Sequence, residues 1–294
     1  MFSLLLLLAT QTPTNVQTYS PAVDALIADR ANLASGELIK RLEALANGGD
    51  LSAAEALGEF AQHGGSSLPR NPTKACDWYA RAAGERADST HNLALCFKTE
   101  NGRPRDAARA RTLYGVAAAK GWIQAKCALG TMLVRGLGGP ADAPRGVALC
   151  REAAVAGNAH AQTDYANYLL MGEGVSKDVV EARRWYTAAA EQNQPNAALV
   201  LGQICWNGDG VVADYAAAER WWRVAHDHGR ADAAGLIVQA VFRRMITTRD
   251  GKQVVDRSML PEAVHWLRIA AEKEPDPARR ATFAETLKAL TAES

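Results

Sequence analysis

The sequence predicts an all-α solenoid, a stack of antiparallel helix pairs with no β-sheet, and three observations support this fold class. Similar segments recur along the chain at intervals of 36 residues. Hydrophobic residues occupy 48% of the 294 positions but aromatic residues only 6%, and the apolar remainder is dominated by alanine, a strong helix former. Within each segment the apolar positions recur at steps of three and four residues, as amphipathic helices require.

The repeat is clearest in the middle of the chain, where MGEGVSKDVVEARRWYTAAA (171–190) aligns without a gap on NGDGVVADYAAAERWWRVAH (207–226). One position in the second half of each unit is aromatic or apolar and is expected to pack in the core. Its occupants are Trp78, Leu113, Leu149, Trp185, Trp221 and Trp266. They are 35, 36, 36, 36 and 45 residues apart, so six units are visible and the last contains a nine-residue insertion.

Each unit is predicted to be two helices joined by a glycine-containing turn. Asp178 and Asp214 stand directly before second helices, where a short carboxylate caps free N–H groups. Gly157 and Gly229 are placed to end second helices in the left-handed conformation, and Gly202 allows neighbouring helices to approach closely. One helix pair cannot cover its own apolar face, so the repeats must stack.

These residues resemble the Sel-one-like repeat (SLR), a relative of the tetratricopeptide repeat, over roughly residues 45–275. Repeat four carries the motif residues Gly172, Gly174, Val175, Asp178, Ala182, Trp185, Tyr186, Ala189 and Ala190. Repeat five carries Leu201, Gly202, Gly208, Gly210, Val211, Asp214, Ala218, Trp221 and Ala225. Repeat two departs from the motif at Glu100 and Arg103, and repeat six lacks the glycine turn. The resemblance implies a right-handed superhelix whose first helices line a concave groove, and a role as adaptor or scaffold without chemistry of its own.

The expected organisation has four parts. Residues 1–20 are expected to comprise a signal peptide and a flexible N-terminal segment, because an apolar run from Phe2 to Ala9 that resembles a secretory signal precedes a polar stretch. An N-terminal helical cap (21–52), six repeats (53–276) and a C-terminal capping helix (277–294) follow. A signal peptide indicates a periplasmic or secreted protein, with a cytoplasmic location as the alternative. No later segment has 18 uninterrupted apolar residues, so no membrane insertion of the mature protein is expected.

Composition and motifs argue against several classes of function. Thirty-three basic and 32 acidic residues give a net charge of +1, which does not favour nucleic acid as a partner. The Gly-x-Gly turns have no preceding strand and no following Lys-Ser/Thr, so no nucleotide or other cofactor is expected. His226 and His228 are two residues apart on a helix and point in different directions, so no metal site is expected. A non-enzymatic protein-binding or peptide-binding module is favoured; the alternative is a secreted hydrolase acting on cell-wall or antibiotic substrates, as suggested for some cysteine-rich relatives.

The five cysteines form two candidate disulfide pairs and one single thiol. Cys127 and Cys150 are almost the same number of residues from one predicted turn, so antiparallel helices would bring them to the same height. Cys76 and Cys96 are placed in the same way about another predicted turn. Residues at the same height need not point toward each other, and the tetratricopeptide analogy places Cys127 on the groove side. The sequence therefore does not decide whether either pair forms a disulfide. Cys205 is expected to be a buried free thiol.

The tetratricopeptide analogy also gives a register for the groove. With the Leu-Gly pair at positions seven and eight of the first helix, positions two, five, nine, twelve and thirteen face the groove. The candidate binding residues are then Thr131, Val134, Arg135, Asn167, Leu170, Gln203, Trp206, Asn207, Phe242 and Arg243. Position twelve holds Lys98 in repeat two, but its other four residues, Val134, Leu170, Trp206 and Phe242, are apolar. These four would form a stripe that suits a partner helix or extended peptide. The same spacing equally fits packing against the next helix.

Overall fold

The computed structural model describes residues 18–31, 35–64, 69–210, 212–249 and 252–292. The signal-like run Phe2–Ala9 and the motif residue Val211 lie outside the described residues. The chain divides into two compact units, residues 1–158 and 159–294.

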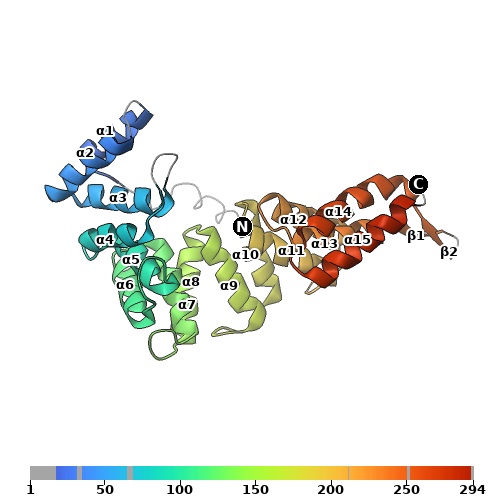
Figure 1. The fold of residues 1–294 in the computed structure, drawn as a ribbon. Coiled ribbons are helices and arrows are strands. Elements are labelled where there is room, and N and C mark those ends of the chain that lie inside the picture. The colour runs from blue at the N-terminus through green and yellow to red at the C-terminus, as the bar shows by residue number, and fades with distance from the viewer. Residues whose placement is uncertain (1–17, 32–34, 65–68, 211, 250–251, 293–294) are drawn as a thin grey trace, which may run out of the picture. The chain divides into compact units, whose positions relative to one another are not determined.

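The first unit consists of consecutive helices, and from α3 onward they form antiparallel pairs (Figure 1). Its elements are α1 (Pro21–Ala28), a 3-10 turn (Asp29–Ala31), α2 (Ser35–Asn47), α3 (Leu51–His63), α4 (Pro72–Ala82), α5 (Ala87–Thr99), α6 (Ala107–Ala119), α7 (Ile123–Val134) and α8 (Ala143–Val155). The pairs α3–α4, α5–α6 and α7–α8 are the first three repeats.

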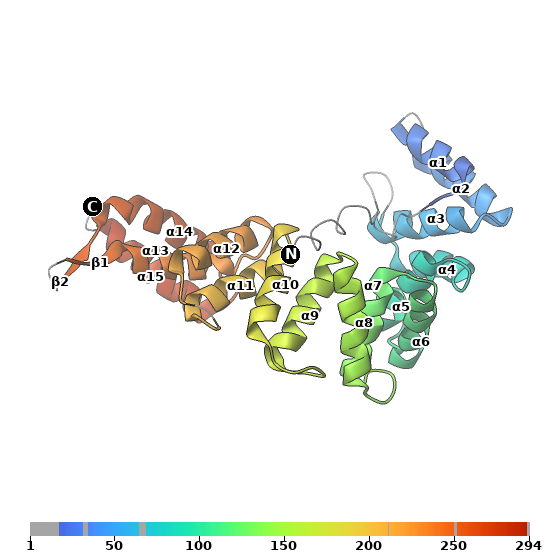
Figure 2. The same ribbon diagram turned by 180° about the vertical axis from the view of Figure 1, so that it is seen from behind.

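The second unit continues the same pattern and adds a β-hairpin (Figure 2). Its elements are α9 (Ala159–Met171), α10 (Val179–Glu191), α11 (Pro195–Asn207), α12 (Tyr215–Asp227), α13 (Ala233–Met245), β1 (Ile246–Arg249), β2 (Lys252–Val255), a 3-10 turn (Arg257–Met259), α14 (Leu260–Lys273) and α15 (Pro277–Ala292). The pairs α9–α10, α11–α12 and α13–α14 are repeats four to six, so the predicted helix-pair solenoid is confirmed.

Local capping follows the sequence. Asp178 Oδ1 accepts from the Glu181 N–H at 2.9 Å, and Asp214 Oδ1 accepts from the Ala217 N–H at 2.8 Å, which confirms both as N-caps. Glu100, where the repeat motif has glycine, adopts the left-handed conformation with φ 55°. The turn of repeat two is therefore kept although its first glycine is lost.

An aromatic ring from the second helix fills the core of most repeats. Tyr79, Tyr114, Tyr186 and Trp222 are at most 3% exposed. Each of them follows by one residue the position that the sequence predicted to be the core position. Of the predicted residues only Trp266 is buried, whereas the other five are half-buried. The predicted residues thus lie at the edge of the core, as Trp78 and Leu113 do, and in four repeats the next residue fills its centre, because only packing decides which of two adjacent residues points inward.

Small residues on the first helix make room for these rings. A Cβ atom added to Gly58 of α3 would lie 2.3 Å from Cε1 of Tyr79, and one added to Gly202 of α11 would lie 2.4 Å from Cδ1 of Trp222. Trp222 also donates from Nε1 to the Leu199 carbonyl oxygen at 3.2 Å. The predicted close approach at Gly202 is therefore confirmed, and its partner is Trp222.

The insertion in repeat six forms a two-stranded antiparallel sheet, so the prediction of a fold with no β-sheet was wrong. Ile246 pairs with Val255 and Arg249 with Lys252. In both views the hairpin extends away from α13, α14 and α15 (Figure 1 and Figure 2). The β-branched runs on both sides of Asp250–Gly251 suit a hairpin, but the helical period of the repeats masked that local signal.

Helices at both ends cover the outer repeats, as expected of a solenoid. Val23, Leu38 and Leu42 of α1 and α2 are buried with Leu57 of α3 in one hydrophobic cluster. At the other end Phe283 of α15 lies against Gly235 of α13. These contacts cover apolar faces that the terminal repeats would otherwise expose.

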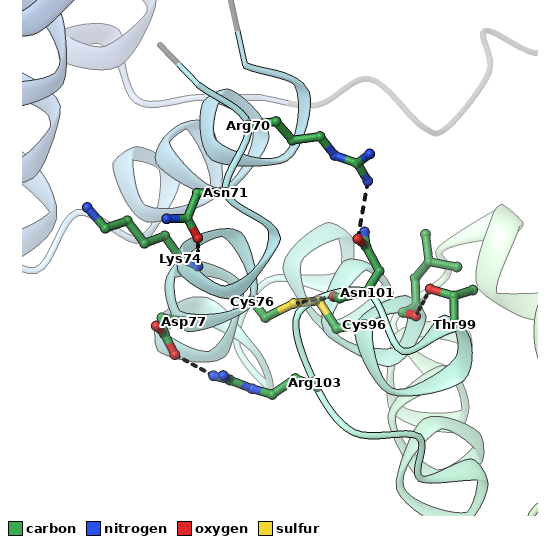
Figure 3. Close-up of a disulfide and its surroundings, with 10 residues drawn as sticks. Arg70, Asn71, Lys74, Cys76, Asp77, Cys96, Thr99, Asn101 and Arg103 are labelled. Atoms are coloured by element: carbon green, nitrogen blue, oxygen red, sulfur yellow. Dashed lines mark hydrogen bonds and ion pairs between the residues drawn. A yellow bond between two sulfur atoms is a disulfide. The ribbon is translucent and has the colours of Figure 1, made fainter.

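Four of the five cysteines are paired. Cys76 of α4 is bonded to Cys96 of α5, which links repeats one and two (Figure 3). Cys127 is bonded to Cys150, which links the two helices of repeat three. Cys127 is only 5% exposed, so it is buried against α8 and does not open onto the groove side where the tetratricopeptide register placed it.

The 100–103 loop closes over the first disulfide. The carbonyl oxygen of Asn101 lies 3.0 Å from Cys76 Sγ, and Arg70 donates to Asn101 Oδ1 at 3.2 Å (Figure 3). Arg103 forms an ion pair with Asp77 of α4. The loop therefore covers the bond on one side.

The close contact at Gly58 predicts that even one methyl group is destabilising. We expect Gly58→Ala to lower the free energy of unfolding by about 1–3 kcal/mol, because Tyr79 must move. Gly115→Ala in α6 is the matched control, since no atom lies within 4 Å of an added Cβ there. The control should be neutral or stabilise by about 0.5–1 kcal/mol in urea unfolding. Equal effects of the two changes would contradict the packing described.

The disulfide pairing predicts the number of free thiols. Protein isolated without reductant and then denatured should react at one cysteine, Cys205, and at all five after reduction. Ellman titration and mass mapping of the linked peptides measure this. Five thiols before reduction would contradict both bonds, and three would contradict one.

Candidate binding surface

The first helices of repeats one to five begin 36 residues apart, at Leu51, Ala87, Ile123, Ala159 and Pro195, and α13 of repeat six is counted from Ala231, 36 residues after Pro195, although the helix itself begins at Ala233. Counting from these residues gives each first helix positions one to thirteen, and the side chains at positions two, five, nine, twelve and thirteen are called the first-helix face. In α11 this face holds Asn196, Leu199, Gln203, Trp206 and Asn207, none of which is fully buried. The helix buries the other side, including Leu201 and Ile204.

An aromatic and cationic group dominates the first-helix face of the second unit. The Trp206 ring lies 4.8 Å from the Tyr215 ring and 5.4 Å from the Trp222 ring, measured between centroids. The guanidinium of Arg243, from α13, lies 5.0 Å from the centroid of Tyr215. Trp206 and Tyr215 are half-buried and Arg243 is exposed. Side chains from three consecutive helices therefore meet at this group.

Tyr215 was not predicted from the sequence. It follows the N-cap Asp214 and therefore belongs to a second helix, which the groove register does not include. Its one sequence signal is an aromatic residue at a position where the preceding repeats have Val179 and Ala143.

Polar predicted residues lie beside this group. Gln203 and Asn207 are exposed, and Gln203 Nε2 donates to Asn207 Oδ1 at 2.8 Å. Asn207 in turn donates to Asp209 Oδ2 at 3.1 Å. In α9, Asn167 accepts from the Tyr186 hydroxyl at 2.6 Å, and Leu170 is half-buried. The amide side chains Asn167, Gln203 and Asn207 are thus held in place by local hydrogen bonds.

Phe242 borders a different part of the surface from the Trp206 group. It lines a hollow with Met245 at the end of α13, Ile246 and Val255 of the hairpin, and Leu260. The position-twelve residue of repeat six therefore borders the insertion.

In the first unit the predicted residues of α7 divide between surface and core. Arg135 is exposed and Thr131 is half-buried. Val134 is only 7% exposed, and its Cγ2 would lie 2.8 Å from a Cβ added to Gly146 of α8. Val134 is therefore a core residue and does not contribute to an open apolar stripe.

A polar cluster that the sequence did not single out lies on the first-helix face of repeats one and two. Glu55 of α3 is fully buried and accepts from the Ser89 hydroxyl and, at 2.9 Å, from Asn92 Nδ2. Asp88 is 4% exposed and pairs with Arg86. The sequence signal is a lone carboxylate inside an alanine-rich stretch, SAAEALG (52–58), where every neighbouring residue is small or apolar.

The surroundings of Glu55 favour its neutral form. Burial raises the pKa of this carboxyl to about 7, and the nearby charges of Asp88 and Glu59 act in the same direction, while the Ser89 hydrogen bond and Arg86 act against it. Burial, with a smaller contribution from Lys98, lowers the pKa of His91 to about 4. Glu55 therefore titrates at a higher pH than an exposed carboxyl group does.

Three side chains of types that hydrolases use, Ser89, His91 and Cys205, have buried reactive groups. Ser89 is fully buried and bonded to Glu55, and in the described part of the chain no hydrogen-bond partner is present for His91 Nδ1, whose ring lies 5.2 Å from Tyr114. Burial raises the pKa of the Cys205 thiol, which disfavours the reactive thiolate.

Neither a metal cluster nor a membrane-crossing helix is found among the described residues. His226 lies against the Trp266 ring at 5.1 Å and His228 ends α12. No group of three or more His, Cys, Asp or Glu side chains there is close enough to hold a metal ion. No described helix is long and apolar enough to cross a bilayer.

The raised pKa of Glu55 predicts a stability that falls as pH rises. The folded state holds this proton more tightly than the unfolded state, so the stabilisation is complete below about pH 4.5 and is lost as pH rises through about 7. In urea unfolding, wild type should lose about 3 kcal/mol over this range relative to Glu55→Gln; the comparison of the two chains cancels the opposite contribution of His91, whose lowered pKa adds stability as pH rises. Glu285→Gln, an exposed carboxyl on α15, is the control and should keep the dependence. A wild-type profile identical to that of Glu55→Gln would contradict the assignment.

Comparisons with known proteins place the chain in a family. The family model described as Sel1 repeat matches six segments, residues 51–84, 87–122, 123–158, 159–194, 195–229 and 250–274, which together form more than half of the chain. The first five begin at the first residue of α3, α5, α7, α9 and α11. The first repeat thus begins two residues before the predicted boundary at 53. A search of curated proteins gave no match.

Two solved structures share the fold. A Sel1 repeat protein from Oxalobacter formigenes is 22% identical, with a TM-score of 0.69, and the match covers 88% of this chain and 100% of that chain. A protective antigen of uropathogenic Escherichia coli that displays an SLR fold is 24% identical, with a TM-score of 0.64, over 82% of this chain. This chain spans 50% of the length of that antigen. Six matched repeats and their helix pairs together show that the chain belongs to the Sel1 repeat family.

Proposed function

We propose that the protein is a non-enzymatic scaffold that binds a protein segment or peptide on its first-helix face. The observation that carries this proposal is the group formed by Trp206, Tyr215 and Arg243, in which neighbouring helices present aromatic rings and a cation at the surface. Trp, Tyr and Arg are the residues that most often dominate the energy of protein interfaces.

The surroundings of the group suit a peptide chain. Gln203 and Asn207 expose amide groups beside Trp206, and such groups can bond the main chain of an extended ligand. An apolar centre with a polar border is the usual composition of a protein interface. Stacked helix pairs within one unit also offer a continuous surface, which supports the same function.

We further propose that the protein works in an oxidising compartment, such as the periplasm or the extracellular space. The disulfides Cys76–Cys96 and Cys127–Cys150 support this, because structural disulfides persist where thiols are not kept reduced. The signal-like run Phe2–Ala9 agrees with export. Titration of thiols in protein taken from its native source tests the proposal, and five free thiols would contradict it.

The binding proposal predicts that Trp206→Ala weakens partner binding by about 2 kcal/mol or more. The partner is first captured from the native source with wild-type protein and identified, and its affinity is then titrated by calorimetry against both chains. Fold stability should change little, because the Trp206 side chain is only half-buried.

Trp221→Ala is the matched control, since Trp221 is another half-buried tryptophan but belongs to the second helix and lies outside the first-helix face. It should leave partner binding unchanged. If Trp206→Ala instead lowers the free energy of unfolding by about 3 kcal/mol or more, Trp206 serves core packing and the proposed surface is wrong.

A further inference from the structure

Residues 18–20, which directly precede α1, contact the first-helix face of repeat one. Ser20 has φ −68° and ψ 155°, and residues 18–20 form no helix or strand. Ser52 and Glu59, which contact this segment, are at positions two and nine of α3, and Arg86 directly precedes α5. Residues 18–20 are called the N-terminal strap.

The strap is held through both its main chain and its side chains. Arg86 Nη1 donates to the Thr18 carbonyl oxygen at 3.1 Å, and the Ser20 N–H donates to Ser52 Oγ at 2.8 Å. The Tyr19 hydroxyl donates to Glu59 Oε2 at 2.8 Å. A ligand peptide in a groove is recognised in the same way, by main-chain hydrogen bonds together with a side chain at a defined place.

Anchoring of α1 does not depend on these contacts alone. Val23 is fully buried in the cluster that joins α1 and α2 to α3, and this apolar contact holds the cap. The hydrogen bonds of the strap contribute little net stability, because water or another chain can replace them, but the Tyr19 ring also packs against the apolar cluster of α1, α2 and α3. A ligand that brings its own tyrosine can replace this packing as well, so the strap can leave while Val23 holds the cap in place.

The surface beside the strap has room for more of a ligand. A hollow next to Glu59 is lined by Gln62, Asn92, Leu95 and Asn101, among others. It combines amide groups with an apolar side chain, so it suits the residues that flank a bound tyrosine.

We propose that the N-terminal strap occupies, within its own chain, a binding site on α3 and α5 for an extended peptide with a tyrosine between small hydroxyl residues. A partner segment of this chemistry displaces Thr18, Tyr19 and Ser20. The inference rests on the proposed scaffold function and names a second surface for it. The tyrosine must be unphosphorylated, because Glu59 and Asp88 would repel a phosphate group.

The test measures binding of the capped, fluorescently labelled peptide NVQTYS, the sequence of residues 15–20, to full-length protein by anisotropy. Wild-type chain is compared with Thr18→Gly/Tyr19→Gly/Ser20→Gly, which removes the strap side chains and loosens its backbone. The variant should bind the peptide about tenfold more tightly than wild type, because its site is no longer occupied. Peptides NVQTFS and phosphotyrosine NVQTYS should bind about tenfold more weakly than NVQTYS.

Two further variants complete the test. Glu59→Ala in the glycine variant should abolish the gain, and Glu285→Ala, at an exposed carboxylate of α15, should not. Ser20 also caps α1, so circular dichroism is used to check that the glycine variant keeps its helix content. If the helix content falls, the variant Tyr19→Phe replaces it in the test, because it keeps the cap. Tyr19→Phe should bind the peptide more tightly than wild type.

Equal binding to wild-type and opened chains, or no binding to either, overturns the inference. Partner capture that depends on Trp206 would then still stand. Loss of the Trp206 effect together with retained peptide binding would reject the proposed surface on the second unit alone.

Discussion

The fit of a large second-helix ring against the facing first helix is the interaction on which most repeats depend. Tyr79 packs where α3 has Gly58, and Trp222 packs where α11 has Gly202, with no space for a methyl group in either case. Because the ring reaches the backbone of the facing helix, it sets how closely and at which register the two helices pair. In repeat three Cys150 takes the place of the ring, and the bond to Cys127 joins the helices directly. A covalent link thus replaces a packing contact at the equivalent position.

Because the contacts that pair the helices lie in the core, the residues of the first-helix face can differ from repeat to repeat. In the second unit this face carries Trp206 with Tyr215 and Arg243 beside it, whereas in the first it carries the half-buried carboxylate Glu59, and Glu55 is fully buried. One scaffold therefore presents two surfaces of different chemistry. An aromatic surface favours ligands through desolvation and stacking, and a carboxylate surface selects by hydrogen bonding and charge.

The N-terminal strap and the hairpin are additions to the repeat fold, and both attach outside the helix pairs. The strap uses polar groups of α3 and α5 that the stacking of helices does not require. The hairpin at Ile246–Val255 extends repeat six and borders a hollow with Phe242 and Leu260. Neither addition disturbs the ring-to-glycine contacts, because each is attached outside the helix pairs.

The 36-residue period, alanine content and turn residues determined the fold class, the helix pairs and the caps Asp178 and Asp214, because these depend on contacts within a repeat or between equivalent positions. The chain alone did not decide which of two adjacent bulky residues enters the core, that Val134 is buried, or that the insertion forms strands. Nor did it indicate that Tyr19 meets Glu59 forty residues away, or that Tyr215 joins Trp206 and Arg243. These depend on side chains from separate helices meeting at one place, and a linear period specifies spacing along a helix but not the distances between helices.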